Sequence, residues 1–183
     1  YNYAHIGNMR PVVVFDTLRR FLTYVGYEVT YVSNYTDVDD KIIKAAKIEG
    51  KKEKELTDFY IAAYEQTIKD IGAMSPNIKP RVTDYMNQII AYIENLVKIG
   101  AAYVVDGDVY FRVNKIKDYG ALSGINIDDL LVGARIEENT LKESPLDFAL
   151  WKKANEGIKW SSPWGEGRPG WHTECCVMVE NIF

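Results

Sequence analysis

Residues 5 to 35, HIGNMRPVVVFDTLRRFLTYVGYEVTYVSNY, decide the fold class of this chain. Apolar side chains recur at helical spacing from Val12 to Val25, with Pro11 tolerated in the first turn and Gly26 ending the run. The next residues, 27 to 35, are rich in β-branched and aromatic side chains, which is typical of a strand. The end of a strand, a helix and a second strand in this order predict half of a nucleotide-binding α/β unit.

Helical periodicity returns in four later segments, at residues 39–48, 56–74, 83–99 and 172–183. Residues 102–113 form two β-rich runs around Asp106-Gly107, a pair that predicts a tight hairpin turn. The polar residues 114–144 are typical of an insertion rather than of core, and residues 145–152 are apolar again. The chain therefore mixes helices with β-structure throughout.

The composition fits a folded domain. Of 183 residues 47% are apolar, so the chain can bury a continuous core as one large or two small domains. No apolar run approaches the roughly 18 residues of a membrane-spanning helix, and the net charge of −4 neither supports nor excludes an RNA partner. The cysteines, Cys175 and Cys176, are neighbours that cannot crosslink distant segments, which predicts reduced thiols and a cytoplasmic location.

The first candidate site is His5-Ile6-Gly7-Asn8, where a helix is expected to begin. A helix start offers free backbone N–H groups and positive partial charge, and glycine lets a ligand approach the backbone closely. His5 can then donate to a phosphoryl oxygen, with Arg10 as a nearby cation. The alternative is that His5 is only a hydrogen-bonding residue of the helix start and Gly7 only a turn residue.

The segment TDVDD, residues 36–40, concentrates three carboxylates in four positions. One interpretation is a site for magnesium or an amine, because ligands of α/β sheets bind outside the carboxyl ends of the strands. The other is a helix N-terminus, in which Thr36 caps the helix and Asp39 completes a pattern like a capping box. Local sequence logic favours the cap.

The segment WHTECC, residues 171–176, brings imidazole, carboxylate and thiol groups together, with His172 and Cys175 three residues apart. Zinc prefers these ligand types. Two or three local groups do not complete a tetrahedron, however, and the chain has no Cys-x-x-Cys pair. The alternative is that the two cysteines are core residues beside Val177 and Met178.

Six segments match one enzyme family in the same order. They are YNYAHIGN (1–8), NYTDVDDKII (34–43), PRVT (80–83), GDVYF (107–111), DFALWK (147–152) and SPWGEGRPGWHTEC (162–175). Together they closely resemble the cysteinyl-tRNA synthetases, which are class I aminoacyl-tRNA synthetases. The last segment alone is too long for a chance match.

The resemblance implies an α/β fold, with the Rossmann-like parallel sheet of a class I synthetase and a connective α+β insertion, incomplete at both ends. It also implies three parts. Residues 1–79 would be the first half of the Rossmann catalytic domain, 80–146 the connective insertion, and 147–183 the start of the second half.

The resemblance assigns roles to residues as well. His5 and Asn8 would be catalytic and would bind ATP together with Gly7 and Arg10, Thr36 and Trp171 would contact the substrate cysteine, and Cys175 would bind zinc. Asn8 replaces the usual second histidine of the ATP signature, and Cys176 stands where the family usually has serine. We expect His172 to be a pocket wall or a structural residue, and not a zinc ligand. We expect four of these side chains to face one cleft: His5, Thr36, Trp171 and Cys175.

The implied activity is the ligation of cysteine to tRNA. The carboxylate of L-cysteine attacks the α-phosphorus of ATP, bound with Mg²⁺, and the aminoacyl group then passes to the 3′ end of tRNA(Cys). One Zn²⁺ per full-length subunit would bind the substrate thiolate, with its other three protein ligands outside residues 1–183. The resemblance further implies a monomer without membrane contact, and a chain that is inactive without the rest of the enzyme.

Two other functions fit the same residues. A cysteine ligase of this fold would join cysteine to an amino sugar instead of tRNA. A non-catalytic paralogue would bind tRNA or a protein through the same scaffold. The combination of His5, Thr36, Trp171 and Cys175 argues against the paralogue, since a binding module has no use for it.

Overall fold

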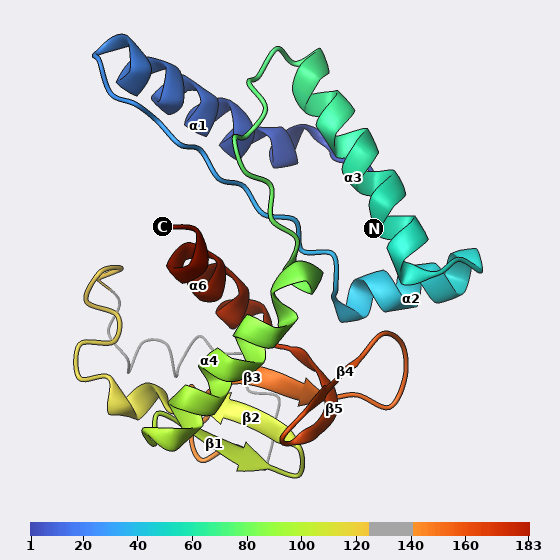
Figure 1. Ribbon diagram of the computed structural model, residues 1–183, viewed down its shortest axis with the longest axis vertical. Helices are drawn as coiled ribbons and strands as arrows, with labels where there is room; N and C mark the ends of the chain where they lie inside the picture. The colour runs from blue at the N-terminus through green and yellow to red at the C-terminus, as the bar shows by residue number, and fades with distance from the viewer. Residues whose placement is uncertain (125–140) are drawn as a thin grey trace. The chain divides into compact units, whose positions relative to one another are not determined.

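The computed structural model describes residues 1–124 and 141–183 (Figure 1). These residues form two compact units, Tyr1–Asp84 and Tyr85–Phe183. The three-part division with boundaries after residues 79 and 146 stays a prediction, and residues 125–140 of the expected insertion lie outside the described part. Within that part, no helix has both the length and the apolar character to cross a membrane.

Helices dominate the first unit. They are α1 (Ile6–Tyr24), α2 (Asp40–Glu49) and α3 (Glu53–Asp70). All three were expected, but α1 begins directly after His5, earlier than the apolar spacing indicates, because the side chains of His5 and Asn8 cap its first turn. Ile42, Ala46 and Leu56 are nearly fully buried and form a small core between α2 and α3.

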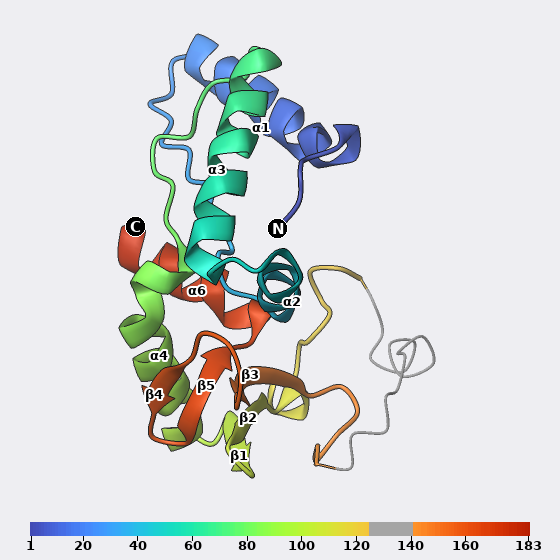
Figure 2. The same cartoon turned by 90° about the vertical axis from the view of Figure 1, so that its right-hand side faces the viewer.

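The turn that follows α3 is tied to α1 (Figure 2). Asp16 accepts a hydrogen bond from the backbone N–H of Met74 (2.9 Å), and Arg20 donates to the carbonyl of Gly72 (3.1 Å). Arg19 donates to the carbonyl of Ser75 (2.9 Å). These contacts join the C-terminal half of α1 to the turn that follows α3.

The expected strand at residues 27–35 is wrong, and the expected parallel sheet is not confirmed. This segment makes only isolated parallel bridges, to residues 78 and 81. Ser33 donates to the carbonyl of Ile78 (3.1 Å), and the next bond of a parallel ladder would come from the N–H of residue 80. Pro80 has no N–H, so the ladder is interrupted and resumes where Tyr35 donates to the Pro80 carbonyl (2.9 Å).

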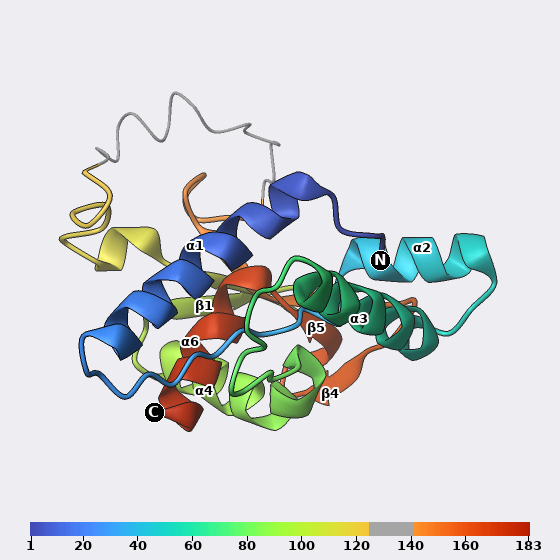
Figure 3. The same cartoon turned by 90° about the horizontal axis from the view of Figure 1, so that it is seen from above.

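An antiparallel sheet forms the second unit together with α4 (Met86–Lys98) and α6 (Trp171–Ile182) (Figure 3). Its strands are β1 (Ala102–Val105), β2 (Asp108–Phe111), β3 (Phe148–Lys153), β4 (Trp160–Ser162) and β5 (Gly165–Pro169), in the order β1-β2-β3-β5-β4. Two 3₁₀-helices, η1 (Val82–Tyr85) and η2 (Val113–Lys115), precede α4 and follow β2. The helices expected at residues 83–99 and 172–183 are confirmed.

The expected hairpin at Asp106-Gly107 is also confirmed. Val105 pairs with Asp108 across the turn, and Asp106 and Gly107 both have positive φ, 51° and 92°. Two central residues with positive φ are the requirement of a tight two-residue hairpin turn. The turn therefore fixes the register of β1 on β2.

The strand β3 lies in the middle of this sheet, between β2 and β5. Its neighbour β2 comes from the expected insertion, whereas β3 itself belongs to the expected second half, so both share one sheet. The start of α6 lies so close to β3 that a side chain on Gly170 would overlap the carbonyl oxygen of Ala149. Trp151, Val177 and Met178 are buried where the sheet and α6 meet.

A buried carboxylate closes the connection between β2 and β3. Asp147 is 2% exposed and accepts hydrogen bonds from the hydroxyl of Tyr103 (2.9 Å) and the backbone N–H groups of Val113 (3.0 Å) and Ser144 (3.1 Å). Beside it, the guanidinium of Arg112 makes two hydrogen bonds of 2.7 Å to the carboxylate of Glu143. Residues at the two ends of the 114–144 stretch are thus joined directly.

Candidate functional site

The start of α1 is built by reciprocal hydrogen bonds. His5 is the N-cap, and its Nδ1 atom accepts a hydrogen bond from the backbone N–H of Gly7 (3.0 Å). The Oδ1 atom of Asn8 accepts one from the backbone N–H of His5 (3.0 Å). Both side chains therefore satisfy backbone donors that a helix start leaves without helical partners.

These bonds determine what the two side chains can offer a ligand. Because the Nδ1 atom of His5 is an acceptor, the proton of the neutral imidazole lies on Nε2, which can donate. Because the amide oxygen of Asn8 is engaged by His5, its NH₂ group is the end that can donate to a ligand. The capping role of His5, set out above as an alternative to catalysis, is compatible with phosphate binding.

A pocket of about 540 Å³ opens beside this helix start. Its lining residues are Tyr1, Asn2, Tyr3, Ala4, His5, Gly7, Asn8, Pro11 and Tyr64. Arg10 is exposed on α1 and does not line the pocket. Three of the four residues expected to bind ATP thus share one pocket.

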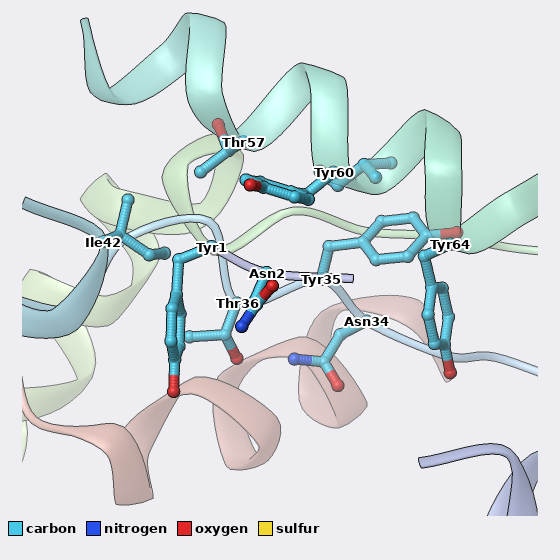
Figure 4. A pocket seen from close by; sticks show the side chains of 10 residues that line it. Tyr1, Asn2, Asn34, Tyr35, Thr36, Ile42, Thr57, Tyr60 and Tyr64 are labelled. Atoms are coloured by element: carbon cyan, nitrogen blue, oxygen red, sulfur yellow. The ribbon is translucent and has the colours of Figure 1, made fainter. Parts of the chain in front are cut away.

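A second pocket, of about 220 Å³, contains Thr36 (Figure 4). It is lined by Tyr1, Asn2, Asn34, Tyr35, Thr36, Ile42, Thr57, Tyr60, Ile61 and Tyr64. Tyr1, Asn2 and Tyr64 line both pockets, so the two adjoin within the first unit. The lining side chains are aromatic rings, amides, hydroxyls and two isoleucines, which makes the Thr36 pocket polar without charged side chains.

The carboxylates after Thr36 have structural partners. Asp39, not Thr36, is the N-cap of α2, and its Oδ1 atom accepts from the backbone N–H of Lys41 (2.7 Å). Asp37 is 7% exposed and binds both the backbone N–H (3.0 Å) and the hydroxyl (2.6 Å) of Thr83. The favoured cap is therefore confirmed with a different capping residue, and Thr36 lines the pocket.

Sequence reasoning missed a polar cluster behind the Thr36 pocket. The hydroxyl of Tyr35 donates to the Oε1 atom of Glu65 (3.0 Å), and the same oxygen accepts from Lys79 (2.7 Å). Burial and the bond to Glu65 raise the pKa of Tyr35, while the bond from Lys79 lowers the pKa of Glu65. Tyr35 therefore stays a neutral donor to the charged carboxylate of Glu65. No local sequence signal links Tyr35, Glu65 and Lys79, because they lie far apart in the chain.

Trp171 and His172 lie in the second unit, at the start of α6. They line a pocket of about 520 Å³ with Asp108, Tyr110, Lys142, Phe148, Ala149, Lys152, Lys153 and Gly170. The ring of His172 packs against those of Phe148 (centroids 4.6 Å apart) and Trp171 (5.5 Å). His172 is thus part of a pocket wall, and Trp171 is 69% exposed. The expected cleft that joins these residues to His5 stays a prediction.

Cys175 and Cys176 are free thiols on exposed positions of α6, so they are not the core residues of the alternative interpretation. The neighbouring Val177 and Met178 are the buried ones. Among the described residues, no group of three or more His, Cys, Asp or Glu side chains is placed to hold a metal ion. Those residues do not make up a zinc site, since Cys175 would supply a single ligand of a tetrahedron.

Comparison with known proteins places these features in a family. The model of the tRNA synthetases class I (C) catalytic domain matches residues 1–183. The chain is 55% identical to a cysteine–tRNA ligase of Anoxybacillus flavithermus over 184 aligned residues, which cover 100% of this chain and 40% of that protein. It is 54% identical to the cysteine–tRNA ligases of Brevibacillus brevis (98% of this chain, 38% of that protein) and Thermosipho africanus (100% and 39%).

The chain spans about two fifths of the length of these curated relatives. The family model covers the whole chain, including the His5 helix start, the Thr36 pocket and the Trp171 pocket. The chain therefore belongs to the family of the tRNA synthetases class I (C) catalytic domain.

Proposed function

We propose that this chain takes part in the ATP-dependent activation of L-cysteine and its transfer to tRNA(Cys). The observation that carries the proposal is the adjoining pair of pockets in the first unit. One pocket places a helix start and two donor side chains where a phosphate can bind, and the other is a small polar pocket around Thr36. Such a pair suits a nucleotide beside a small amino acid.

His5 has the central role in the proposed first step. The carboxylate oxygen of cysteine attacks the α-phosphorus of ATP, the new O–P bond forms, and pyrophosphate leaves. Negative charge on the phosphoryl oxygens is stabilised by the Nε2–H of His5, the NH₂ group of Asn8 and the partial positive charge of the α1 start. No protein nucleophile is required, so positioning and charge stabilisation carry the rate. Magnesium would accompany ATP, and exposed Arg10 would add a cation near its phosphates.

Selectivity for cysteine is proposed to come from Thr36, Trp171 and Cys175. Thr36 lines the polar pocket, and Trp171 is an exposed ring that can cover a small substrate. The family's Zn²⁺ would use Cys175 as one ligand, with the remaining ligands from outside this chain.

The partners proposed for the whole protein are tRNA(Cys), ATP and L-cysteine, in the cytoplasm and with a monomeric subunit. The free thiols of Cys175 and Cys176 suit a reducing compartment. Synthesis of cysteinyl-tRNA also agrees with the names of the relatives, each of which is a cysteine–tRNA ligase.

Cysteine-dependent exchange of labelled pyrophosphate into ATP tests the activation step in the full-length protein. We expect exchange with cysteine, little exchange with serine, and charging of tRNA(Cys) when that tRNA is added. Absence of exchange in zinc-supplemented buffer would contradict the enzymatic proposal and favour a binding paralogue. Exchange without tRNA charging would instead favour a ligase that transfers cysteine to an amino sugar.

A further inference from the structure

Thr36 lies between two residues whose side chains are anchored elsewhere in the first unit. We propose that Glu65 and Thr83 are positioning residues: by holding the side chains of Tyr35 and Asp37, they keep the Thr36 hydroxyl in the pocket. The proposal rests on the proposed function, because it gives that hydroxyl a substrate to bind. It concerns residues that do not themselves contact the substrate.

The first anchor holds Tyr35. Its hydroxyl donates to Glu65 (3.0 Å), Lys79 donates to the same carboxylate oxygen (2.7 Å), and the Tyr35 ring meets the ring of Tyr64 edge to face, with centroids 6.3 Å apart. Its backbone is held as well, since the N–H of Tyr35 donates to the Pro80 carbonyl (2.9 Å). Residue 35 is therefore fixed at both its backbone and its side chain.

The second anchor holds Asp37. One carboxylate oxygen accepts from the backbone N–H of Thr83 (3.0 Å) and the other from its hydroxyl (2.6 Å). Asp37 is 7% exposed, so the carboxylate is largely shielded from water and depends on these donors. Thr83 lies 46 residues further along the chain, which makes this a tertiary anchor and not a local turn.

The two anchors determine the direction of the residue between them. Side chains of an extended segment alternate between opposite sides. Figure 4 shows the ring of Tyr35 directed toward α3, whereas the side chains of Asn34 and Thr36 leave the chain on the other side. With residues 35 and 37 both tied down, rotation of the segment that would withdraw Thr36 must break hydrogen bonds at two places.

A rigid backbone at this point matters because a short hydroxyl has little reach of its own. Displacement of a substrate-binding group by about 1 Å can lower catalytic efficiency by about 10²-fold. The segment is not part of a regular sheet, because Pro80 interrupts its ladder. Side-chain anchors supply the rigidity that a continuous strand would otherwise give.

Thr83→Val tests the second anchor in the full-length protein. It removes the hydroxyl but keeps the shape of the side chain and the backbone N–H. We expect the KM for cysteine to rise about 10-fold to 100-fold while the KM for ATP changes little, and Thr83→Ser to restore the wild-type value. Thr67→Val is the matched control, because the Thr67 hydroxyl donates to Ala63 within α3 and does not line either pocket.

A double-mutant cycle separates positioning from general destabilisation. If Thr83 acts through Thr36, the variant with both Thr36→Val and Thr83→Val should be no worse than Thr36→Val alone. Multiplication of the two effects would overturn the proposal. Glu65→Leu, which removes the acceptor of the Tyr35 hydroxyl, repeats the cycle from the first anchor and serves if Thr83→Val does not fold.

A crystal structure of Thr83→Val gives a result that does not depend on activity. Displacement of the Thr36 hydroxyl from the pocket supports the proposal, and an unchanged Thr36 rotamer overturns it. If the wild-type protein shows no pyrophosphate exchange but Thr36 is displaced in the variant, the proposed function fails while the positioning role stands.

Discussion

The imidazole ring of His5 lies against Gly7, so close that a Cβ atom at residue 7 would be 2.7 Å from the ring's Cε1 atom. The backbone of Gly7 is helical, and its φ is not positive. Glycine is therefore needed here for space and not for an unusual backbone conformation. The ring can fold back over the first turn of α1 only because residue 7 has no side chain.

Gly7→Ala should displace the His5 ring and lower the rate of pyrophosphate exchange by about 10²-fold. Stability should change little, because the loss of the His5 cap, about 1 kcal/mol, is offset by the higher helix propensity of alanine, also about 1 kcal/mol. Exchange kinetics and thermal unfolding measure the two effects separately. As a control, Gly50→Ala should lower stability by about 1 kcal/mol, since φ is 63° there, but leave exchange intact. Equal exchange rates for Gly7→Ala and the wild type would refute the close-packing explanation.

Asn8→Asp should separate helix capping from phosphate binding. The carboxylate can still accept from the backbone N–H of His5, and its negative charge suits a helix N-terminus, so stability should be unchanged or slightly higher. The substitution replaces an NH₂ donor by a negative charge next to the proposed phosphate site. We expect the KM for ATP to rise about 10-fold or more. Asn8→Ala should instead lose both stability and ATP affinity.

Trp171→Ala should weaken cysteine binding with little effect on folding. Because Trp171 is 69% exposed, its removal leaves no cavity, and the free energy of unfolding should change by less than about 0.5 kcal/mol. Trp151 offers the contrast, since it is 0% exposed and Trp151→Ala should cost about 3–5 kcal/mol. Urea unfolding of both variants measures the change in the free energy of unfolding, and the KM for cysteine of Trp171→Ala measures the change in substrate binding. A large loss of stability in Trp171→Ala would show that this ring is structural.

The hydroxyl of Tyr103 should stabilise the second unit in a pH-dependent way. Burial, together with the hydrogen bond to Asp147, raises the pKa of Tyr103 to about 12. The unfolded chain loses this proton near an ordinary pKa of about 10. The stabilisation is therefore complete below about pH 10 and is lost as the pH rises through about 12.

Tyr103→Phe removes that titration. At pH 8 it should destabilise the protein by about 1–3 kcal/mol, because buried Asp147 loses a donor. The difference from the wild type should shrink as the pH is raised above 10 in urea unfolding experiments. Tyr24→Phe, at a residue that is 89% exposed, should show no such trend. A difference that stayed constant up to pH 11 would count against the proposed titration.

Local signals predicted the helices and the hairpin of this chain. The apolar spacing of α4 and the Asp106-Gly107 pair act over a few residues, and the structure follows them. The strand β5 could not be predicted, because Gly165–Pro169 contains two glycines and no β-branched residue. It is a strand because β3 and β4 pair with it on both sides.

The candidate site, like the fold, was predicted from the sequence only in part. His5, Gly7, Asn8 and Thr36 were predicted as site residues from short motifs and the family resemblance, and they line adjoining pockets. The anchors at Glu65 and Thr83 were missed, because each bond joins residues that no periodicity relates. The prediction of a parallel strand at residues 27–35 was wrong for a related reason. Pro80 blocks the ladder at residues 33 to 35, and its effect follows only once the partner segment is known.

The bonds from Arg112 to Glu143 and from Val113 to Asp147 have a practical consequence for engineering. They close the polypeptide across β2 and β3 whatever length of sequence connects them. Each doubling of that length costs only about 0.6 kcal/mol of closure entropy. A fluorescent reporter or an affinity tag with neighbouring termini could therefore be inserted beside Leu122, which is fully exposed, while the sheet keeps its register.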